Sequence, residues 1–277
     1  MANILQQLAD HARVRTNEAK QIISEEQMKE KALRLAAEDR QRFRFARTLC
    51  GSDIAFICEV KQASPSKGQI WRPDAGDCAE GRSEAAFPYL EIAKEYEAAG
   101  AECISVLTEP KWFKGSSEYL RQIAHNVSAP CLRKDFTVDE YMIYEAKVLG
   151  ASAVLLICAL LDQDTVASYI RIADSLGLSA LVEAHDGEEI RMALDAGARI
   201  IGVNNRNLKD FTVDVSNSDR LRRLVPEDVL FIAESGIRTA EDVRLLRETG
   251  VDACLVGETL MRASDKGAML RKLRGLE

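Results

Sequence analysis

Short apolar runs alternate with longer amphipathic segments along most of this chain. The runs are rich in valine, isoleucine and leucine and have the length of β-strands: Ile54–Val60, Cys103–Leu107, Cys131–Lys134, Ala153–Cys158, Ala180–Glu183, Ile200–Asn204, Val229–Ala233 and Ala253–Val256. The segments between them include several with a helical period: Tyr89–Ala99, Val138–Leu149, Gln163–Leu176, Glu188–Ala196 and Ala240–Thr249. Because the runs are continuously apolar rather than alternating, they indicate a parallel sheet that is covered on both faces.

A glycine lies between several of these helices and the next strand: Gly100, Gly150, Gly177, Gly197 and Gly250. Glycine adopts the left-handed conformation that ends a helix without a steric penalty. About eight strand–helix units in little more than 200 residues favour an α/β fold of the (β/α)8 TIM-barrel type. The alternative is a doubly wound sheet, but the first strand is not followed by a G-x-G-x-x-G turn.

Two segments depart from this alternation. Residues 1–50 have a dense charge pattern, and we expect them to form a helical extension packed on a single barrel domain that comprises residues 1–277. The alternative is an amphipathic arm that serves only solubility. Residues 72–87 form a long polar loop, and such loops are commonly mobile lids or disordered segments. We interpret this one as a tolerated surface elongation, since added loop length costs little closure entropy.

Composition limits the classes of partner. The 277-residue chain has 37 Lys and Arg against 44 Asp and Glu, a formal charge of −7. This balance argues against nonspecific nucleic-acid binding but leaves room for a local basic pocket. We expect no signal peptide, because no basic segment leads into an apolar core at the start. We expect no membrane span either, because no apolar run approaches the roughly 20 residues that a span needs.

The cysteine and histidine patterns argue against metal and disulfide chemistry. Seven cysteines without C-x-x-C spacing indicate buried free thiols, and hence a cytoplasmic protein. His11, His125 and His185 are scattered and give no zinc spacing. With no dinucleotide-binding loop either, we expect neither a metal nor an organic cofactor.

The first predicted strand carries two charges near its C-terminal end. Side chains alternate across a strand, so Glu59 and Lys61 point to the same face. Two charges on one face are costly to bury unless they pair with each other or with a substrate. The pair is therefore either a structural salt bridge or part of an active site.

Charged and polar residues recur at the ends of later strands. In a TIM barrel the active site lies at the C-terminal ends of the strands. The strands would deliver these residues there: Glu59, Lys61, Lys134, Glu183, Asn204, Arg206, Glu234 and Glu258. Arg133 and Asp135 lie on the opposite strand face, where salt bridges to neighbouring helices are their expected use.

The last two strand–helix turns suggest a phosphate site. Small residues after late strands let backbone N–H groups approach an anion closely. The candidates lie after the seventh and eighth predicted strands, where barrels often bind phosphate: Ser235, Gly236, Gly257 and Glu258.

The chain resembles the indole-3-glycerol-phosphate synthase family from about Ile54 to Met261, and its helical extension is similar too. The resemblance depends on these motifs: Glu59–Gly68, Ser105–Glu109, Leu132–Phe136, Val154–Ile157, Leu181–Glu183, Gly202–Leu208, Ala233–Ile237 and Leu255–Met261. The first motif and the Asn204-Asn205-Arg206 block are the most specific. The length of the loop 72–87 departs from the family pattern.

The resemblance implies a lyase of tryptophan biosynthesis acting on the sugar phosphate 1-(2-carboxyphenylamino)-1-deoxyribulose 5-phosphate. The reaction would close the indole ring, release carbon dioxide and lose water. By resemblance Lys134 is the general acid that protonates the developing alkoxide. Lys61, with Glu59 or Glu183, would share the proton transfers of the dehydration, and their division is left open.

The resemblance also implies residues that bind the substrate. Arg206 and Asn204, with Ser64, would hold the anthranilate carboxylate and hydroxyl groups, since Arg offers a planar fork matched to a carboxylate. Phe113 and Phe136 are candidates for an apolar wall against the aromatic ring. Glu234 is also expected to contact the substrate. The sequence does not decide whether the chain is a monomer or docks with other tryptophan-pathway enzymes.

Three other functions are alternatives for a chain of this kind. Phosphoribosylanthranilate isomerase uses a similar barrel, but its proton transfers require a Cys/Asp pair that Glu59 and Lys61 replace poorly. A Schiff-base aldolase would use Lys134 or Lys61 as the nucleophile. A non-catalytic scaffold would have degraded strand-end charges, which are intact here.

Overall fold

The computed structural model describes residues 4–72, 86–206, 212–214 and 216–276. Eight parallel strands close into a barrel in the order β1-β10-β9-β8-β7-β6-β5-β4. Their bounds are β1 Ala55–Val60, β4 Cys103–Leu107, β5 Cys131–Lys134, β6 Ala153–Ile157, β7 Ser179–Ala184, β8 Ile200–Asn204, β9 Leu230–Glu234 and β10 Ala253–Val256. Closure comes from β1, which pairs with β4 on one side and with β10 on the other, where Ala55 aligns with Ala253.

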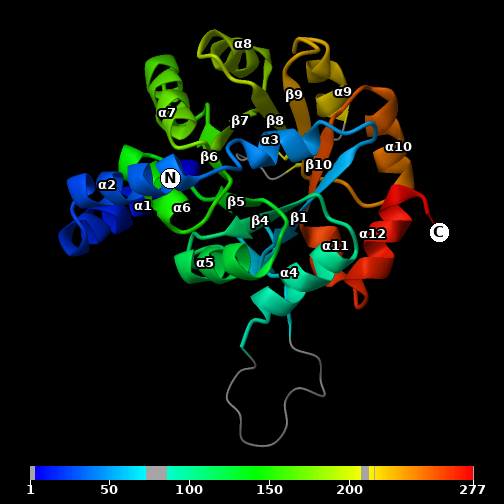
Figure 1. Cartoon of the computed structure of the whole chain (residues 1–277). Coiled ribbons are helices and arrows are strands. Elements are labelled where there is room, and N and C mark those ends of the chain that lie inside the picture. Colours follow the sequence, from blue (N-terminus) through cyan, green and yellow to red (C-terminus); the bar gives the residue numbers. More distant parts are fainter. Residues whose placement is uncertain (1–3, 73–85, 207–211, 215, 277) are drawn as a thin grey trace, which may run out of the picture.

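Helices surround the barrel and precede it (Figure 1). The outer helices are α4 Tyr89–Ala98, α5 Ser117–Asn126, α6 Glu140–Val148, α7 Gln163–Ser175, α8 Gly187–Asp195, α9 Ser216–Arg222, α10 Ala240–Glu248, α11 Glu258–Arg262 and α12 Lys266–Arg274. Three more come before the first strand: α1 Ile4–Ile22, α2 Glu25–Glu38 and α3 Arg44–Leu49. The described part of the chain includes no helix long and apolar enough to cross a membrane.

The predicted TIM barrel is confirmed, and the doubly wound alternative is wrong because β1 and β10 pair and close the sheet. Every predicted strand is present, with bounds that shift by no more than one residue. The five glycines predicted after helices all have positive φ, from 71° at Gly177 to 90° at Gly150. The pattern did not single out α5, α9, α11 or α12, nor the two-residue strands β2 Ala63–Ser64 and β3 Gly68–Gln69.

The apolar core has two layers because strand side chains alternate. Phe56 and Cys58 point outward to the helices, whereas Ile57 points into the barrel. Phe45 and Leu49 of α3 are buried with the inward-facing residues at the starts of the strands, so α3 closes the N-terminal end of the barrel. The polar and charged residues of the strands lie at the opposite, C-terminal end of the barrel.

The N-terminal helices are held on the barrel by polar contacts. Lys20 of α1 lies 2.8 Å from Asp139, and Lys147 of α6 lies 2.5 Å from Asp39, which follows α2. Arg42 donates a 2.7 Å hydrogen bond to the carbonyl of Asp174 in α7. Figure 1 shows α1 and α2 beside α6. The predicted loop 72–87 falls mainly on residues outside the described part of the chain.

The described cysteines are all free, and only Cys50 among them is exposed. Burial raises the pKa of the Cys131 and Cys158 thiols to about 12, so these thiols stay protonated at neutral pH. Cys78 lies outside the described residues.

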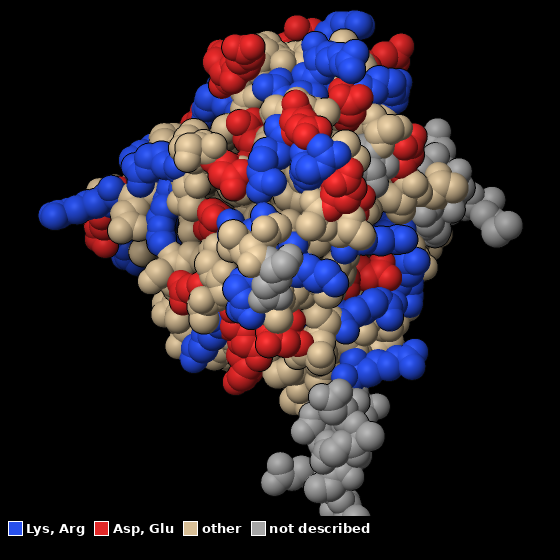
Figure 2. All heavy atoms as spheres, turned by 90° about the vertical axis from the view of Figure 1, so that its right-hand side faces the viewer, with Lys and Arg blue, Asp and Glu red and all other residues tan. Residues whose placement is uncertain are grey.

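The surface carries both signs of charge. Figure 2 shows Lys and Arg side chains intermingled with Asp and Glu over the face it presents. On α10, Arg244 lies 2.6 Å from Glu241, and Arg247 lies 2.6 Å from Asp53. Exposed pairs of this kind contribute little to stability.

Candidate active site

A cavity of about 390 Å³ opens at the C-terminal end of the barrel. Every site residue predicted from the sequence lines it: Glu59, Lys61, Ser64, Phe113, Lys134, Phe136, Glu183, Asn204, Arg206, Glu234, Ser235, Gly236, Gly257 and Glu258. The chain segments that contribute them lie far apart in the sequence, and the barrel topology brings their ends together.

The alternation of strand side chains explains how the ionisable residues reach this cavity. On β1, Ile57 points into the barrel, and Glu59 follows two residues later on the same face. The same step of two residues separates Leu132 from Lys134 on β5. Leu181 precedes Glu183 on β7, and Ile232 precedes Glu234 on β9, in the same way. Each strand thus changes from apolar to charged where it leaves the core.

Lys134 is the centre of a buried ion cluster. Its Nζ lies 2.9 Å from Glu183 Oε2 and 2.8 Å from Glu234 Oε2. Burial opposes the charge of the ammonium group, but the Glu183 and Glu234 carboxylates outweigh it and raise the pKa of Lys134 well above its usual range. The side chain is therefore a charged proton donor held between two carboxylates.

The two carboxylates differ in their protonation. Burial raises the pKa of Glu234 to about 7, with Glu183 adding to the rise and Lys134 opposing it. For Glu183, burial is outweighed by Lys134 and His185, and its pKa is lowered. Glu234 Oε1 is buried with no hydrogen-bond partner among the described residues, and a Cβ on Gly202 would lie only 2.3 Å from it. Glu234 is thus the carboxylate of the cluster that takes up a proton more readily.

His185 extends the cluster toward the surface. Its Nε2 lies 3.5 Å from Glu183 Oε1, and its Nδ1 lies 3.0 Å from Glu189 Oε2. Burial is outweighed by the hydrogen bond to Glu189 and by the charge of Glu183, so the pKa of His185 is raised. In the sequence, this histidine is one of three scattered histidines without zinc spacing, and nothing there places it in the site.

Glu59 and Lys61 lie on the same side of β1 and form an ion pair at the cavity. Lys61 Nζ donates to Glu59 Oε1, and Ser105 Oγ lies 3.5 Å from Glu59 Oε2. Gly257 packs directly against this pair, since a Cβ there would lie 2.5 Å from Glu59 Oε1 and 2.8 Å from Lys61 Nζ. The missing side chain at position 257 therefore makes room for the ion pair.

Arginine side chains supply positive charge on another side of the cavity. Asn204 Oδ1 accepts a 3.0 Å hydrogen bond from the backbone N–H of Arg206, whose guanidinium lies 3.9 Å from Glu258. Glu258 also accepts a 3.1 Å hydrogen bond from Arg262. Arg238 and Arg262 line the cavity too, although the sequence analysis did not select them.

The turn after β9 has an uncommon backbone. Ser235 and Gly236 have φ values of 68° and 86°. A positive φ is strained for a residue with a side chain, and such strain is found at functional sites. Asn205 Nδ2 supports the turn by donating to the Ser235 carbonyl at 3.2 Å. This geometry fits the close approach of backbone N–H groups to an anion.

Aromatic and aliphatic side chains form the remaining wall. The rings of Phe113 and Phe136 lie 6.0 Å apart at 41°. The cavity is also lined by Ile4, Leu5 and Leu8 of α1, which the sequence analysis did not assign to the site. Their spacing is that of a buried helical stripe, but the spacing does not identify what the stripe packs against.

Arg133 of β5 and Asp135, which directly follows the strand, pair with neighbouring helices, as predicted. Arg133 Nη2 lies 2.6 Å from Glu145 of α6, and Asp135 accepts hydrogen bonds from Arg15 of α1. Among the described residues, no group of three or more His, Cys, Asp or Glu is placed to hold a metal ion.

The chain is similar over nearly its full length to proteins of one known family. A family model described as indole-3-glycerol phosphate synthase matches residues 5–273. The chain is 54% identical over 272 residues to the indole-3-glycerol phosphate synthase of Ruminiclostridium cellulolyticum, covering 98% of this chain and 99% of that relative. It is 45% identical over 282 residues to that of Lachnoclostridium phytofermentans, covering 99% of each.

Solved structures support the fold. The 3-hexulose-6-phosphate synthase of Salmonella typhimurium superposes with a TM-score of 0.63 at 14% identity, covering 80% of this chain and 98% of that one. The thiamine phosphate pyrophosphorylase of Pyrococcus furiosus gives a TM-score of 0.57 at 17% identity, covering 80% and 94%. At such low identity the likeness shows the barrel alone.

Proposed function

The chain belongs to the indole-3-glycerol phosphate synthase family, and we propose that the charged residues of its cavity carry out the steps of that family's reaction. The enzyme is a carboxy-lyase of tryptophan biosynthesis. Its substrate is the sugar phosphate 1-(2-carboxyphenylamino)-1-deoxyribulose 5-phosphate.

In the first step the ring carbon that bears the carboxylate attacks the ketone carbon. A carbon–carbon bond forms, and the ketone oxygen takes the electron pair of its π bond. Lys134 protonates this oxygen, because it is a buried ammonium held between Glu183 and Glu234. Carbon dioxide then leaves the ring carbon, and the electrons of the broken bond restore the aromatic ring.

In the second stage the hydroxyl group leaves as water. Lys61, the other lysine of the cavity, protonates the hydroxyl from its position beside Glu59. A carboxylate accepts the anilino proton, and we assign this role to Glu183. Once Lys134 has donated its proton, the charge that lowers the pKa of Glu183 is gone, and Glu183 becomes a stronger base. A final proton shift from carbon to nitrogen gives the indole.

The other lining residues orient the substrate. Arg206, Asn204 and Ser64 bind its carboxylate and hydroxyl groups, and Glu234 contacts it within the Lys134 cluster. Phe113 and Phe136 flank the aromatic ring. These contacts hold the ring carbon against the ketone carbon. In well-oriented systems such positioning lowers the activation barrier by as much as about 7–11 kcal/mol.

The phosphate binds at the turns after β9 and β10. The backbone N–H groups of Ser235, Gly236, Gly257 and Glu258 are the donors. The side chain of Glu258 does not take part, since it accepts a hydrogen bond from Arg262 and a carboxylate would repel the phosphate. We also place the enzyme in the cytoplasm, because its described cysteines are free and mostly buried.

The observation that carries these assignments is the position of Lys134 between two carboxylates inside the cavity. The test is turnover of the synthetic substrate, followed by indole fluorescence, in wild type, Lys134→Ala and Lys94→Ala. Lys94 is an exposed residue of α4 and serves as the control. We expect near-complete loss only in Lys134→Ala, with an unchanged circular dichroism spectrum. Equal activity in all three proteins would transfer the acid role to Lys61.

A further inference from the structure

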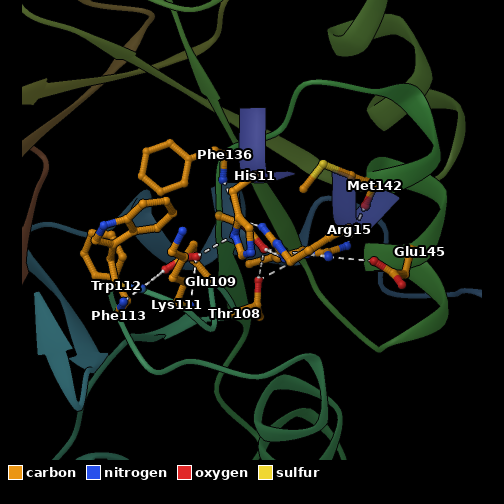
Figure 3. A network of polar contacts seen from close by, with 12 residues as sticks. His11, Arg15, Thr108, Glu109, Lys111, Trp112, Phe113, Phe136, Met142 and Glu145 are labelled. Atoms are coloured by element: carbon orange, nitrogen blue, oxygen red, sulfur yellow. Dashed lines mark hydrogen bonds and ion pairs between the residues drawn. The ribbon is translucent and has the colours of Figure 1, made fainter. Parts of the chain in front are cut away.

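Glu109, two residues after β4, is a fully buried carboxylate with no role in the chemistry described so far. It accepts hydrogen bonds from three consecutive backbone N–H groups: those of Lys111 at 3.0 Å, Trp112 at 2.8 Å and Phe113 at 3.0 Å. Figure 3 shows these donors converging on the carboxylate. The backbone carbonyl of Glu109 also accepts from the N–H of Gly115 at 2.7 Å. The loop is thus folded around this one residue.

The carboxylate supplies the hydrogen-bond acceptor for the backbone N–H groups of this loop. A buried charge is tolerated only where donors compensate it, and hydrogen bonds to a charged group are about twice as strong as neutral ones. The bend is tight, with Lys114 at a φ of 54°, and a Cβ on Gly115 would lie 2.3 Å from the Leu107 carbonyl. Removing the acceptor would leave three backbone N–H groups unpaired in this bend.

The loop carries Phe113 into the cavity. The Phe113 N–H is one of the three groups held by Glu109, and the Phe113 ring faces Phe136. A shift of the loop would therefore move one side of the aromatic wall.

The same carboxylate also contacts α1. His11 Nδ1 lies 3.2 Å from Glu109 Oε1, and the His11 ring meets Trp112 edge-on with ring centroids 5.4 Å apart. The apolar side chains of Ile4, Leu5 and Leu8, on the same helix, line the cavity. Glu109 therefore joins two walls of the site that come from distant parts of the chain.

We propose that Glu109 is a positioning residue of this enzyme: its buried carboxylate sets the place of Phe113 against the aromatic ring of the substrate and fastens α1 beside the cavity. This inference rests on the proposed role of Phe113 in binding that ring. Since the ring is present in both substrate and transition state, the effect falls on KM rather than on kcat.

The test measures KM and kcat for Glu109→Gln, Phe113→Leu and the double variant. Glutamine keeps the size of the side chain but removes the charge, and we expect KM to rise about 10-fold in Glu109→Gln, with kcat within about 3-fold of wild type. Because Glu109 acts through Phe113, the KM of the double variant should stay close to that of the worse single variant. Additive effects would overturn the inference. Glu118→Gln, an exposed carboxylate in α5, is the control and should leave KM unchanged.

A second readout does not depend on activity. The chain has two tryptophans, and in a Trp71→Phe background the fluorescence reports on Trp112 alone. We expect the Trp112 emission to change in Glu109→Gln, and also in His11→Ala, which releases α1 without touching the loop donors. His11 is partly exposed, so this second variant tests the tie to α1 even if Glu109→Gln does not fold. Unchanged emission in both variants would overturn the inference.

The outcomes also separate the inference from the function on which it rests. If Phe113→Leu leaves KM unchanged, the aromatic wall is wrong. If Phe113→Leu raises KM but Glu109→Gln does not, the wall stands and the positioning role of Glu109 is wrong.

Discussion

Arg15 of α1 donates two hydrogen bonds, 2.7 and 3.2 Å long, to the carboxylate of Asp135, the residue that directly follows Lys134. Asp135 is buried, and it also accepts a 2.6 Å hydrogen bond from Thr108 at the end of β4. Burial is outweighed by Arg15 and Arg133, which lower the pKa of Asp135. The N-terminal helix is thus tied to the strand that delivers the proposed general acid.

Breaking this tie should destabilise the protein. In Arg15→Met the Asp135 carboxylate stays buried with fewer donors, and we expect the free energy of unfolding in urea to fall by about 3 kcal/mol. Arg15→Lys should retain only part of this stability, because an ammonium group cannot reproduce the two parallel hydrogen bonds that the guanidinium donates to the carboxylate. Arg13→Met removes an exposed arginine paired with Asp10 and should cost less than about 0.5 kcal/mol. Equal losses in the Arg15→Met and Arg13→Met variants would contradict this account.

A methyl group at position 257 should disturb catalysis without unfolding the barrel. The Cβ of Gly257→Ala would displace the ends of the Glu59 and Lys61 side chains, which are flexible enough to move. Misplacing catalytic groups by about 1 Å can cost 10²-fold, and we expect kcat to fall by roughly that factor. Gly51→Ala is the matched control, since its Cβ would come no closer than 3.5 Å to another group. A fully active Gly257→Ala variant with an unchanged melting temperature would contradict this prediction, because it would show that the ion pair tolerates the added methyl group.

Glu234→Gln should become more stable relative to the wild type as the pH rises. The raised pKa of Glu234 means that the folded chain keeps a proton which the unfolded chain releases at about pH 4.5. The wild type therefore loses stability between about pH 4.5 and 7, whereas glutamine does not titrate. We expect similar unfolding free energies at pH 5 and an advantage of about 3 kcal/mol for the variant at pH 8. Exposed Glu227→Gln is the control, and a gap that does not change with pH would refute the prediction.

His185 should make the stability of the wild type depend on pH in the same direction, at higher pH. Its pKa is raised because the Glu189 hydrogen bond and the Glu183 and Glu234 charges favour the protonated ring in the folded state. This contribution is fully present below about pH 6.5, the usual pKa of histidine, and is lost as the pH rises through the folded-state pKa. The stability difference between wild type and His185→Gln should therefore shrink from pH 6 to pH 9 in urea titrations. NMR titration of the imidazole should give a pKa above that of free histidine, and a value below it would reject this account.

Much of the barrel and its site was predictable because both follow from a period of two residues. Glu59, Lys134, Glu183 and Glu234 each lie two positions beyond a core residue of their strand. A parallel barrel then brings all strand ends to one rim. The apolar runs were long enough to predict the positions of the strands, and the glycines predicted where several helices end.

The rest depended on contacts that no local pattern encodes. Glu109 and His11 are 98 residues apart, and their contact exists only because α1 docks against the loop that follows β4. The two-residue strands β2 and β3 are too short to give a periodic signal. The position of Lys134 between two carboxylates, rather than one, required the barrel register in which Asn204 aligns with Glu234 and Ile157 with Glu183.

The pairing of β1 with β10 also has a consequence for how the chain folds. During synthesis β1 emerges first, and one of its edges stays without its partner until Ala253–Val256 has followed. An unpaired strand edge is a site for pairing with other chains. Pairing between such distant segments is slow because the intervening loop entropy must be lost first. We therefore expect closure of this seam to be a late step in folding and the stage at which the nascent chain is most prone to aggregate.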